Sequence, residues 1–596
     1  MNFLGRAGSG RRVTAPRFLS PRRQHRNQIR RSRRIGGVGS VLAVILALLV
    51  AACAGQGSPS PTQQGSQTDD ESGASNGAAE GADPQSDAEA GSEPALAWGP
   101  TEAELAEATE RAAQMSDEDL AGQVIIARYS GTDPAQAAAV VRAHHLAGVI
   151  LFADNIASLD QVRATAAAVQ EAHRDLGRDW PAAVSVDNEG GLVQRMSAAS
   201  GPWTSFPQFA AAGAAADPVV VTEAAAAMAR ELRASGVTMN FAPVADVSMG
   251  PQDPTINTRA AGSEPEVVSA AVAAAVDGFD DGGVLASLKH FPGHGSLTVD
   301  SHESLPVQRA AAEDLAERDL VPFEAGIRAG APMVMMGHIA VEEWDPGVPA
   351  TLSPAAYEVL REDLGFTGVA ITDGLDMGAL TATRSSGQIA LEALNAGADL
   401  LLTPADVAGA HEAIVAALAD GSLDRERVVQ AAGRVIAMQR WQAQQAERQA
   451  PDDDEVGAGA PASQALSASA ISLVAGECEG PWLGQSVFVQ GGAESDVAAF
   501  RRAAANAGLE VTASAGQADT SVALIGTGGG PAVDADVAIA LDGPWDLAGA
   551  DAPTLVAAHG RTEHTMAALV EVLTDTQAPP GRLAFDVEGL PGTACP

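Results

Sequence analysis

The segment Lys289-His-Phe-Pro-Gly-His-Gly295 is chemically the most unusual on the chain. Lys289 is the single lysine of a sequence that contains 35 arginines. A crowded site that needs a compact point donor favours an ammonium over a planar guanidinium, so we predict that Lys289 lies in a binding site. Chance is the alternative, because the pattern rests on one residue.

The pair Asp300 and His302, two residues apart, predicts proton transfer. A carboxylate bonded to one ring nitrogen fixes the tautomer of the imidazole and raises its pKa, which leaves the second nitrogen to donate and retrieve a proton. A hydrogen bond that only stabilises the loop is the alternative.

Three histidines in this region, His290, His294 and His302, raise the question of a metal site. Pro292 and Gly293 interrupt any helix, so the pattern differs from the two-histidine zinc helix, and no carboxylate stands at ligand spacing. We therefore predict neither a metal nor an organic cofactor.

The run Ile371-Thr-Asp373 places a carboxylate at the end of an apolar segment. A carboxylate at the end of a buried strand is held rigidly and suits nucleophilic attack on the anomeric carbon of a sugar. Asp376 is the competing carboxylate, and we expect it to support the loop because it lies beyond the strand end.

Short apolar runs alternate with Ala-rich helical stretches between Trp98 and residue 450. The eight runs are Val124–Ala127, Gly148–Phe152, Ala183–Asp187, Val237–Phe241, Val284–Lys289, Met333–His338, Gly368–Asp373 and Ala398–Leu402. The helical stretches include Pro134–His145, Leu159–Leu176, Pro218–Ser235, Pro265–Asp281, Ala310–Ala329 and Pro354–Asp363. This strict alternation predicts an α/β fold whose parallel strands close a (β/α)8 barrel of the TIM type. An open, doubly wound sheet is the alternative.

Polar residues stand at or just past the ends of five of these runs. They are Asp187, Asn240, Lys289 with His290, His338 and Asp373. Active sites of (β/α)8 barrels are built on the face where the strands end, so we expect one active site at this rim.

The net charge of −40 is unevenly distributed along the chain. Residues 1–52 contain eleven arginines and no acidic residue, so the rest has 25 basic against 76 acidic residues and a charge near −51. Such a chain is repelled by phosphate backbones and anionic lipid headgroups, and we predict no nucleic-acid partner.

Residues 1–52 predict an export signal. Basic residues precede the apolar run Val41–Val50, and Ala51-Ala52-Cys53 after it resembles the lipobox of bacterial lipoproteins. We expect Cys53 to be lipidated and to anchor the protein to the outer face of the cell membrane. An uncleaved span over residues 35–54 is the alternative, since its 20 residues are near the minimum for a bilayer. The route of export, general secretory or twin-arginine, is left open.

Composition divides the remaining chain into four parts. Residues 53–97 contain almost nothing apolar beyond alanine and predict a disordered acidic tether. Residues 98–450 predict the barrel and 451–462 a linker. Residues 463–596, with strand-like runs at 486–489, 520–525, 537–540 and 554–557, predict a smaller α/β sandwich domain. Cys478 and Cys595 lie in this last part of an exported chain, where an oxidising compartment favours a disulfide. Two buried thiols are the alternative.

Several motifs occur in an order that resembles glycoside hydrolase family 3. They are Val186-Asp-Asn-Glu-Gly-Gly191 with Gln194-Arg195, Asn240-Phe-Ala-Pro-Val244, the Lys289–Gly295 segment, Asp300-Ser-His302 and Ile371-Thr-Asp373. The third and fourth resemble the β-N-acetylglucosaminidase branch of that family. The match spans roughly residues 115–440, and the C-terminal part is more loosely similar to the family's sandwich domain.

The resemblance implies retaining hydrolysis through a covalent glycosyl-enzyme. Asp373 matches the nucleophile, His302 the general acid/base and Asp300 its partner. The positions that match sugar-binding residues of the family are Asp187, Arg195, Arg259, Lys289 and His290. Asn188 and Leu192 stand where the branch often has Gln and Arg, which leaves the fine substrate preference open, and we expect Glu189 to be structural.

These observations together favour an exo-acting β-N-acetylglucosaminidase that removes terminal GlcNAc from peptidoglycan fragments, with chitin oligomers as the other candidate substrate. A glycoside phosphorylase is an alternative, because a neutral histidine repels incoming phosphate less than a glutamate does. A wall-binding lipoprotein without activity and a zinc-dependent hydrolase are the remaining alternatives.

Overall fold

The computed structural model describes residues 95–196, 201–448, 453–526 and 534–595. The predicted export signal, Cys53 and all but the last three residues of the predicted tether lie outside these ranges. Within the described ranges, no helix combines the length and the apolar character that crossing a membrane requires.

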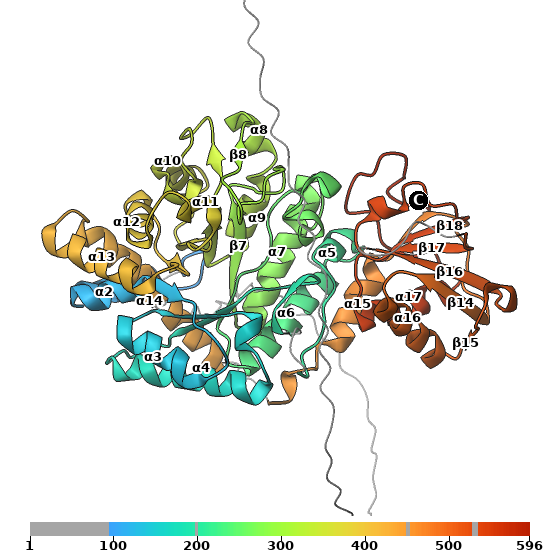
Figure 1. Cartoon of the computed structure of the whole chain (residues 1–596), viewed down its shortest axis with the longest axis horizontal. Coiled ribbons are helices and arrows are strands. Elements are labelled where there is room, and N and C mark those ends of the chain that lie inside the picture. The colour runs from blue at the N-terminus through green and yellow to red at the C-terminus, as the bar shows by residue number, and fades with distance from the viewer. Residues whose placement is uncertain (1–94, 197–200, 449–452, 527–533, 596) are drawn as a thin grey trace, which may run out of the picture. The chain divides into compact units, whose positions relative to one another are not determined.

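Eight parallel strands form the first sheet (Figure 1). They are β1 (Ile125–Ala127), β2 (Gly148–Leu151), β3 (Ala183–Val186), β6 (Met239–Asn240), β7 (Leu285–Phe291), β9 (Met333–Met336), β11 (Val369–Thr372) and β12 (Leu401–Leu402). Their order is β11-β9-β7-β6-β3-β2-β1-β12, and a parallel bridge between Ile371 and Leu400 brings the two edges together. The predicted (β/α)8 barrel is confirmed, and the open sheet is excluded.

The register of the barrel aligns the ends of neighbouring strands. Val186 pairs with both Leu151 and Asn240, and Thr372 pairs with Met336. All residues of β1, β2, β3, β7, β9 and β11 are buried, as expected for strands that are covered on both faces. The next residues along each strand therefore meet at a single rim.

Helices cover the outside of this sheet (Figure 1). They are α1 (Glu102–Ala113), α2 (Asp117–Gln123), α3 (Pro134–His144), α4 (Leu159–Asp175), α5 (Ala210–Ala214), α6 (Val219–Ala234), α7 (Pro265–Gly282), α8 (Ala312–Glu317), α9 (Val321–Arg328), α10 (Pro354–Glu358), α11 (Gly378–Thr381), α12 (Ser386–Ala396), α13 (Val407–Asp420) and α14 (Arg425–Arg448). Side-chain caps begin several of them, such as Asp133 before α3 and Ser158 before α4.

Two of the predicted helices differ in the structure. The stretch Ala310–Ala329 is divided into α8 and α9, because Pro322 has no N–H and is tolerated only in the first turn of a new helix. The stretch Pro354–Asp363 is divided into α10 and a π-helical turn over Val359–Asp363. Both errors concern boundaries, and neither moves a strand of the barrel.

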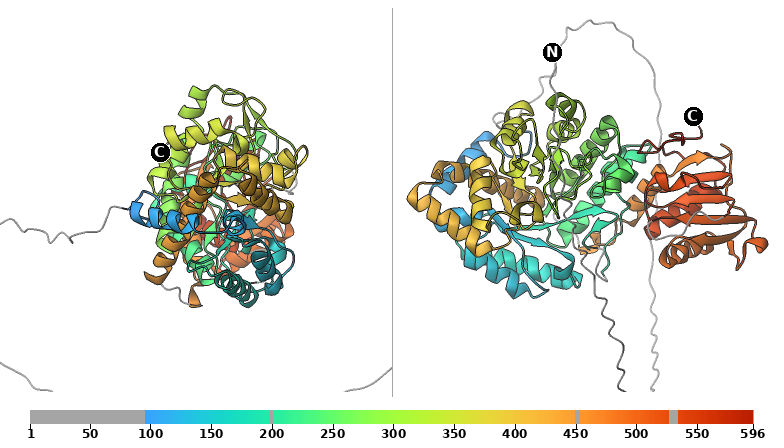
Figure 2. Two further views of the ribbon diagram at one scale, coloured as in Figure 1. Left: turned by 90° about the vertical axis from the view of Figure 1, so that its left-hand side faces the viewer. Right: turned by 45° about the horizontal axis from the view of Figure 1, so that its top comes forward.

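A second sheet of six strands follows, shown in orange and red in Figure 2. Its order is β13 (Ser472–Ala475), β18 (Thr554–Ala557), β17 (Val537–Ala540), β16 (Thr520–Ile525), β14 (Ser486–Gly491) and β15 (Glu510–Val511), with only β13 antiparallel to its neighbour. The helices α15 (Ala460–Ala470), α16 (Glu494–Asn506) and α17 (Glu563–Thr574) belong to this part, which confirms the predicted smaller α/β domain. The sequence interpretation missed β13 and β15, and α15 begins inside the predicted linker.

A disulfide joins Cys478 to Cys595 across 117 residues of sequence. Cys478 precedes β14, and Cys595 lies in the segment after the last helix, where Ala594 donates its N–H to the carbonyl of Leu473 in β13. The bridge therefore fixes the end of the chain to the edge of the second sheet. Closing a loop of this length contributes about 4–5 kcal/mol in the chain-entropy model.

Candidate active site

A cavity of about 400 Å³ opens where the barrel strands end. The polar residues that line it are Arg128, Asp187, Glu189, Arg195, Arg259, Lys289, His290, His302, Asp373, Asp376 and Thr403. Every predicted catalytic or sugar-binding residue except Asp300 is among them, and Asp300 contacts one that is, His302. The rim predicted from the strand ends is thus a single site.

Asp373 directly follows β11, and hydrogen bonds hold both its backbone and its side chain. Its backbone N–H donates to the carbonyl of Met336 on the neighbouring strand at 3.0 Å, and its Oδ1 accepts from the N–H of Gly374 at 2.7 Å. Burial alone would raise the pKa of this carboxyl, but the nearby imidazoles of His290 and His338 and the Gly374 N–H lower it to about 2. The group is therefore a carboxylate near neutral pH.

Lys289 and Glu189 form the centre of a buried ion-pair network. The Nζ of Lys289 lies 2.6 Å from Glu189 Oε1 and 2.9 Å from Asp187 Oδ1. Arg259 donates to the same glutamate through two nitrogens, at 2.8 and 2.9 Å. Burial alone would lower the pKa of Lys289, but the two carboxylates hold it above its ordinary value. Because the cations and carboxylates fix one another, the remaining donors are presented to the cavity in one orientation.

Glu189 was expected to be structural, and its contacts agree with a positioning role. Its carboxylate is 2% exposed, and both oxygens are occupied by the two cations. Burial raises its pKa, but Arg259 and Lys289 outweigh that and hold the pKa well below the ordinary value. Its charge compensates two cations that would otherwise be buried unpaired.

His290 and Arg195 complete the predicted sugar-binding set. The Nδ1 of His290 lies 2.8 Å from Asp246 Oδ2, which leaves Nε2 of this ring for a ligand. Arg195 donates its backbone N–H to the carbonyl of Asp187, and its Nε is buried without a hydrogen-bond partner among the described residues. Asp246 itself is fully buried on the loop after β6, and no sequence pattern singled it out.

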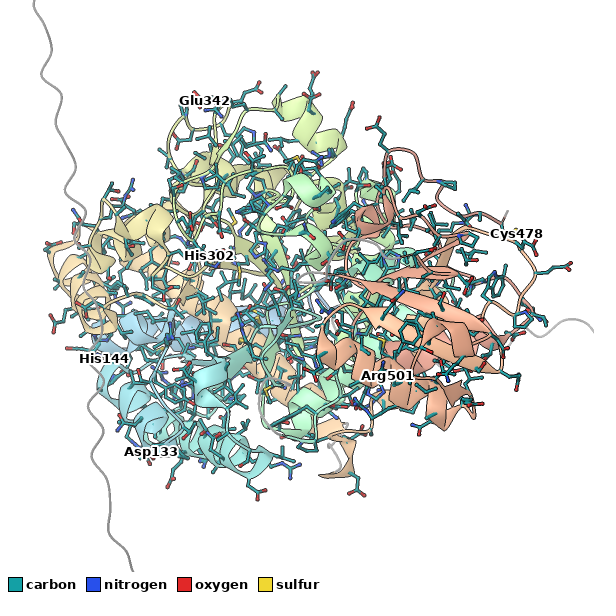
Figure 3. All side chains as sticks on the ribbon, turned by 45° about the vertical axis from the view of Figure 1, so that its right-hand side comes forward. Asp133, His144, His302, Glu342, Cys478 and Arg501 are labelled. Atoms are coloured by element: carbon teal, nitrogen blue, oxygen red, sulfur yellow. A yellow bond between two sulfur atoms is a disulfide. The ribbon has the colours of Figure 1, made fainter. Side chains whose placement is uncertain are left out.

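His302 and Asp300 form the expected pair on the loop between β7 and β8 (Val307–Gln308). The Nδ1 of His302 lies 2.7 Å from Asp300 Oδ1, and the same oxygen accepts the His302 backbone N–H at 2.9 Å. Burial would raise the pKa of Asp300, but these contacts with His302 lower it. Figure 3 labels His302 on the barrel, and its side chain lines the same cavity as Asp373. The side chains of Asp373, after β11, and of His302, on the loop after β7, therefore line the same cavity.

Two residues of the predicted rim support the cavity instead of lining it. His338 is fully buried, with Nδ1 2.7 Å from Thr351 Oγ1 and Nε2 2.8 Å from the carbonyl of Gly374, next to the nucleophile candidate. Asn240 accepts the N–H of Asn188 and donates to its carbonyl, at 2.9 and 2.8 Å. These two polar strand ends therefore belong to the predicted rim but lie beneath the cavity lining.

Arg128, which was not predicted, follows β1 directly and lines the cavity. Its guanidinium stands 4.7 Å from the centre of the Phe152 ring and within 4.0 Å of Asp154 and Asp376. The pattern of polar residues after strand ends points to Arg128, because β1 ends at Ala127, the residue before it. Asp376 also accepts from Thr403 Oγ1 at 3.2 Å, which agrees with its expected role in the loop.

No group of three histidine, cysteine, aspartate or glutamate side chains in the described ranges is arranged to hold a metal ion. His290, His294 and His302 are each engaged elsewhere, with Asp246, Ser301 and Asp300 respectively.

Asp319 packs against Gly293, in the loop that carries His294, and makes the free energy of unfolding depend on pH. Its carboxyl is 3% exposed, and burial raises its pKa to about 7. Between pH 4 and 7 the folded state therefore holds a proton that the unfolded state releases, so the free energy of unfolding falls as pH rises. We expect Asp319→Asn to raise the free energy of unfolding at pH 8 by on the order of 2 kcal/mol. Urea unfolding at pH 4.5 and pH 8 checks this, and an equal effect at both pH values would contradict it.

Comparison with known proteins decides the family. The model of the glycosyl hydrolase family 3 N-terminal domain matches residues 110–438, which is more than half of the chain. The chain belongs to glycosyl hydrolase family 3. It is therefore a glycoside hydrolase, and the matched residues contain the whole cavity lining.

β-Hexosaminidases are among the relatives of this family 3 chain. A β-hexosaminidase of Stenotrophomonas maltophilia (strain R551-3) is 39% identical over 267 residues, which are 43% of this chain and 76% of the relative. β-Hexosaminidase A of Pseudoalteromonas piscicida is 34% identical over 289 residues, which are 46% of this chain. The chain spans about half of the length of that second relative, 48%.

A solved family 3 β-N-acetylglucosaminidase from Paenibacillus sp. str. FPU-7 has the same fold as this chain. The TM-score is 0.70 at 28% identity, and the match covers 79% of this chain and 99% of the other. Both the barrel and the smaller domain are needed to reach that coverage, because the barrel alone ends near residue 448. The family, the branch and the fold expected from the motifs are thereby confirmed.

Proposed function

We propose that the protein is a retaining exo-β-N-acetylglucosaminidase, with Asp373 as nucleophile and His302 as general acid/base. The observation that carries the proposal is the shared cavity: a rigid carboxylate after β11 and an imidazole from the β7 loop face the same space. The ion-pair network of Lys289, Glu189 and Arg259 lies in its wall and offers fixed donors to sugar hydroxyls.

The first step of the reaction follows from these positions. An oxygen of Asp373 attacks C1 of the terminal sugar, while His302 donates a proton to the glycosidic oxygen as the C1–O bond breaks. Asp300 occupies Nδ1 of His302, so Nε2 is the nitrogen that carries this proton. The products are a glycosyl ester on Asp373 and the free aglycone.

The second step reverses the roles. His302, now neutral, accepts a proton from a water molecule that attacks C1, and Asp373 leaves as a carboxylate. The low pKa of Asp373 suits it to leave. The sugar is released with its original β configuration, and no metal or organic cofactor takes part in either step.

The proposed substrate is a GlcNAc-terminated glycan, a peptidoglycan fragment with chitin oligomers as the competing case. An aryl N-acetyl-β-glucosaminide and the matching aryl β-glucoside, followed by muropeptides and chitobiose, test this choice. We expect the N-acetylated aryl substrate to be cleaved, and NMR to show β-GlcNAc as the first product. First release of α-GlcNAc would overturn the retaining mechanism, and GlcNAc 1-phosphate formed in phosphate buffer would identify a phosphorylase.

We further propose that the protein is exported and lipid-anchored through Cys53 at the outer face of the bacterial cell membrane. The basic start, the apolar run and the small residues before Cys53 support it. In a detergent phase-separation assay we expect the full chain from membranes to enter the detergent phase. The Cys53→Ser variant should then not be processed at residue 53. Detergent partitioning of a Cys53→Ser protein of the mature length would contradict the lipid anchor.

A further inference from the structure

The proposed acid/base residue lacks obvious support of its own. The side chain of His302 is 64% exposed, and the chain between Phe291 and Val307 forms no regular helix or strand. An exposed side chain on an irregular loop has many orientations open to it. The contact with Asp300, itself 36% exposed, holds the ring to the loop but does not hold the loop to the barrel.

The residue between Asp300 and His302 is, in contrast, buried. Ser301 is 2% exposed, and its Oγ lies 3.1 Å from Nε2 of His294, which is also 2% exposed. Neither side chain lines the cavity, so neither is placed to meet the sugar. The other ring nitrogen of His294, Nδ1, is buried without a hydrogen-bond partner among the described residues. The contact with Ser301 is therefore the hydrogen bond that holds this ring, and breaking it would leave both buried groups unsatisfied.

His294 is in turn attached to the sugar-binding part of the site. Its backbone N–H donates to Asp246 Oδ1 at 2.6 Å, and the other oxygen of Asp246 contacts Nδ1 of His290 at 2.8 Å. Gly295 follows with equally tight packing, since a Cβ there would lie 2.5 Å from the carbonyl of Val247. The backbone of His294 is therefore tied to the same carboxylate as the ring of His290, which lines the cavity.

The far end of the loop is attached to the nucleophile's segment. The N–H of Gly378, at the start of α11, donates to the carbonyl of His302 at 3.1 Å, and Ala379 donates to that of Ser301 at 3.3 Å. A Cβ at Gly378 would lie 2.6 Å from the His302 carbonyl, so only glycine allows this approach. Ser301 is thus held through its side chain by His294 and through its carbonyl by Ala379, in the segment after Asp373.

We propose that the His294–Ser301 hydrogen bond is a buried latch that positions His302 for proton transfer. It rests on the proposed role of His302, and both latch members are positioning residues that do not touch the sugar. Burial lowers the pKa of His294 to about 4, so its ring is neutral near pH 7. One proton, from either the Ser301 hydroxyl or Nε2 of His294, then forms the hydrogen bond between them. Loss of the latch leaves the dyad intact but lets the loop that carries it move.

The variant that tests the latch is Ser301→Ala, which removes one oxygen, and the matched control is Ser304→Ala on the same loop. Ser304 is exposed, and within the described ranges its hydrogen bond is from its backbone N–H to the carbonyl of Asp300. We expect Ser301→Ala to lower kcat/KM on GlcNAc disaccharides roughly tenfold, a part of the ~10²–10⁴ that general acid–base catalysis supplies. A 2,4-dinitrophenyl glycoside, whose leaving group needs no proton, should lose less than about threefold in kcat/KM, because that constant ends with formation of the glycosyl ester. Ser304→Ala should match the wild type on both substrates.

The double variant Ser301→Ala/His302→Ala separates a latch from a general packing effect. A latch acts only through His302, so the double variant should be no slower than His302→Ala alone. Equal losses on both substrates, or a further tenfold loss in the double variant, would overturn the latch. Failure of the proposed function is seen separately: His302→Ala itself would then show no dependence on the leaving group, whatever Ser301→Ala does.

Discussion

Replacement of Asp373 by asparagine is expected to lower kcat by a factor on the order of 10⁴ or more. The amide keeps the size of the carboxylate and the contact with Gly374 N–H, but it cannot form a stable glycosyl ester. The loss should be the same for disaccharides and activated aryl glycosides, because both need the nucleophile. Steady-state rates together with active-site labelling by a 5-fluoro N-acetylglucosaminyl fluoride measure it.

The label identifies the nucleophile directly. In the wild type it should be found on the peptide that contains Asp373, and the Asp373→Asn protein should not be labelled. Asp376→Asn is the matched control, because Asp376 lies on the same loop and in the same cavity but bonds Thr403. It should lose far less activity and be labelled as the wild type is. A label on Asp376 or on Glu189 would contradict the assignment.

Loss of activity in Asp373→Asn must be separated from loss of folding. The pKa of Asp373 is depressed to about 2, so its charge contributes stability above pH 4 that is lost only as pH falls toward 2. Removal of that charge should therefore cost no more than about 2–3 kcal/mol at pH 7. A thermal unfolding transition close to that of the wild type shows that the fold is retained.

Replacement of His302 by alanine is expected to produce a loss that depends on the leaving group. A disaccharide, whose leaving oxygen needs a proton, should lose about 10²–10⁴ in kcat/KM, whereas a 2,4-dinitrophenyl glycoside should lose little. With the activated substrate the glycosyl ester accumulates, because hydrolysis of the ester also needs the base. Azide should then restore turnover by attacking C1 without base assistance, and the product should be the β-glycosyl azide.

The neighbouring Glu303 provides the control for this variant. Glu303 is exposed on the same loop and outside the cavity lining, so Glu303→Gln should behave as the wild type on every substrate. Rescue of His302→Ala by azide with inversion to the α-azide, or equal losses on both substrates, would remove His302 from the acid/base role.

Much of the site was predictable because it depends on local patterns. A strand in a parallel barrel is an unbroken apolar run, and polar residues at or just past its end lie at the rim. Asp187 and Asp373, which follow β3 and β11, and Lys289, which lies near the end of β7, could therefore be placed from sequence alone. The pair Asp300 and His302 is also local, since two residues of chain fix its geometry. Arg128 obeys the same pattern, because the predicted run and β1 both end at Ala127 and Arg128 is the next residue, but it was not included among the predicted polar strand ends.

Other features depend on contacts between distant segments. Asp246 serves two histidines that lie 44 and 48 residues further along the chain, and Glu189 pairs with cations from two other elements. The spacing of residues in the sequence does not predict such a partner, because the contact forms only when the closed barrel brings distant loops together. Short edge elements such as β15, with two residues, were missed because their pairing comes from the neighbouring strand.

The sequence by itself therefore determined the barrel, the rim and the candidate reactive groups, since burial on both faces of a strand and the chemistry of side chains are properties of local residue types. Only the tertiary structure decided which groups share the cavity and which support it. His338 and Asn240 bond to the backbone of Gly374 and Asn188 beneath the cavity. The loop of His302 is held to α11 by backbone hydrogen bonds. The reason is that closure of the sheet brings the rim residues into a small, close-packed volume, in which not every side chain can reach the cavity.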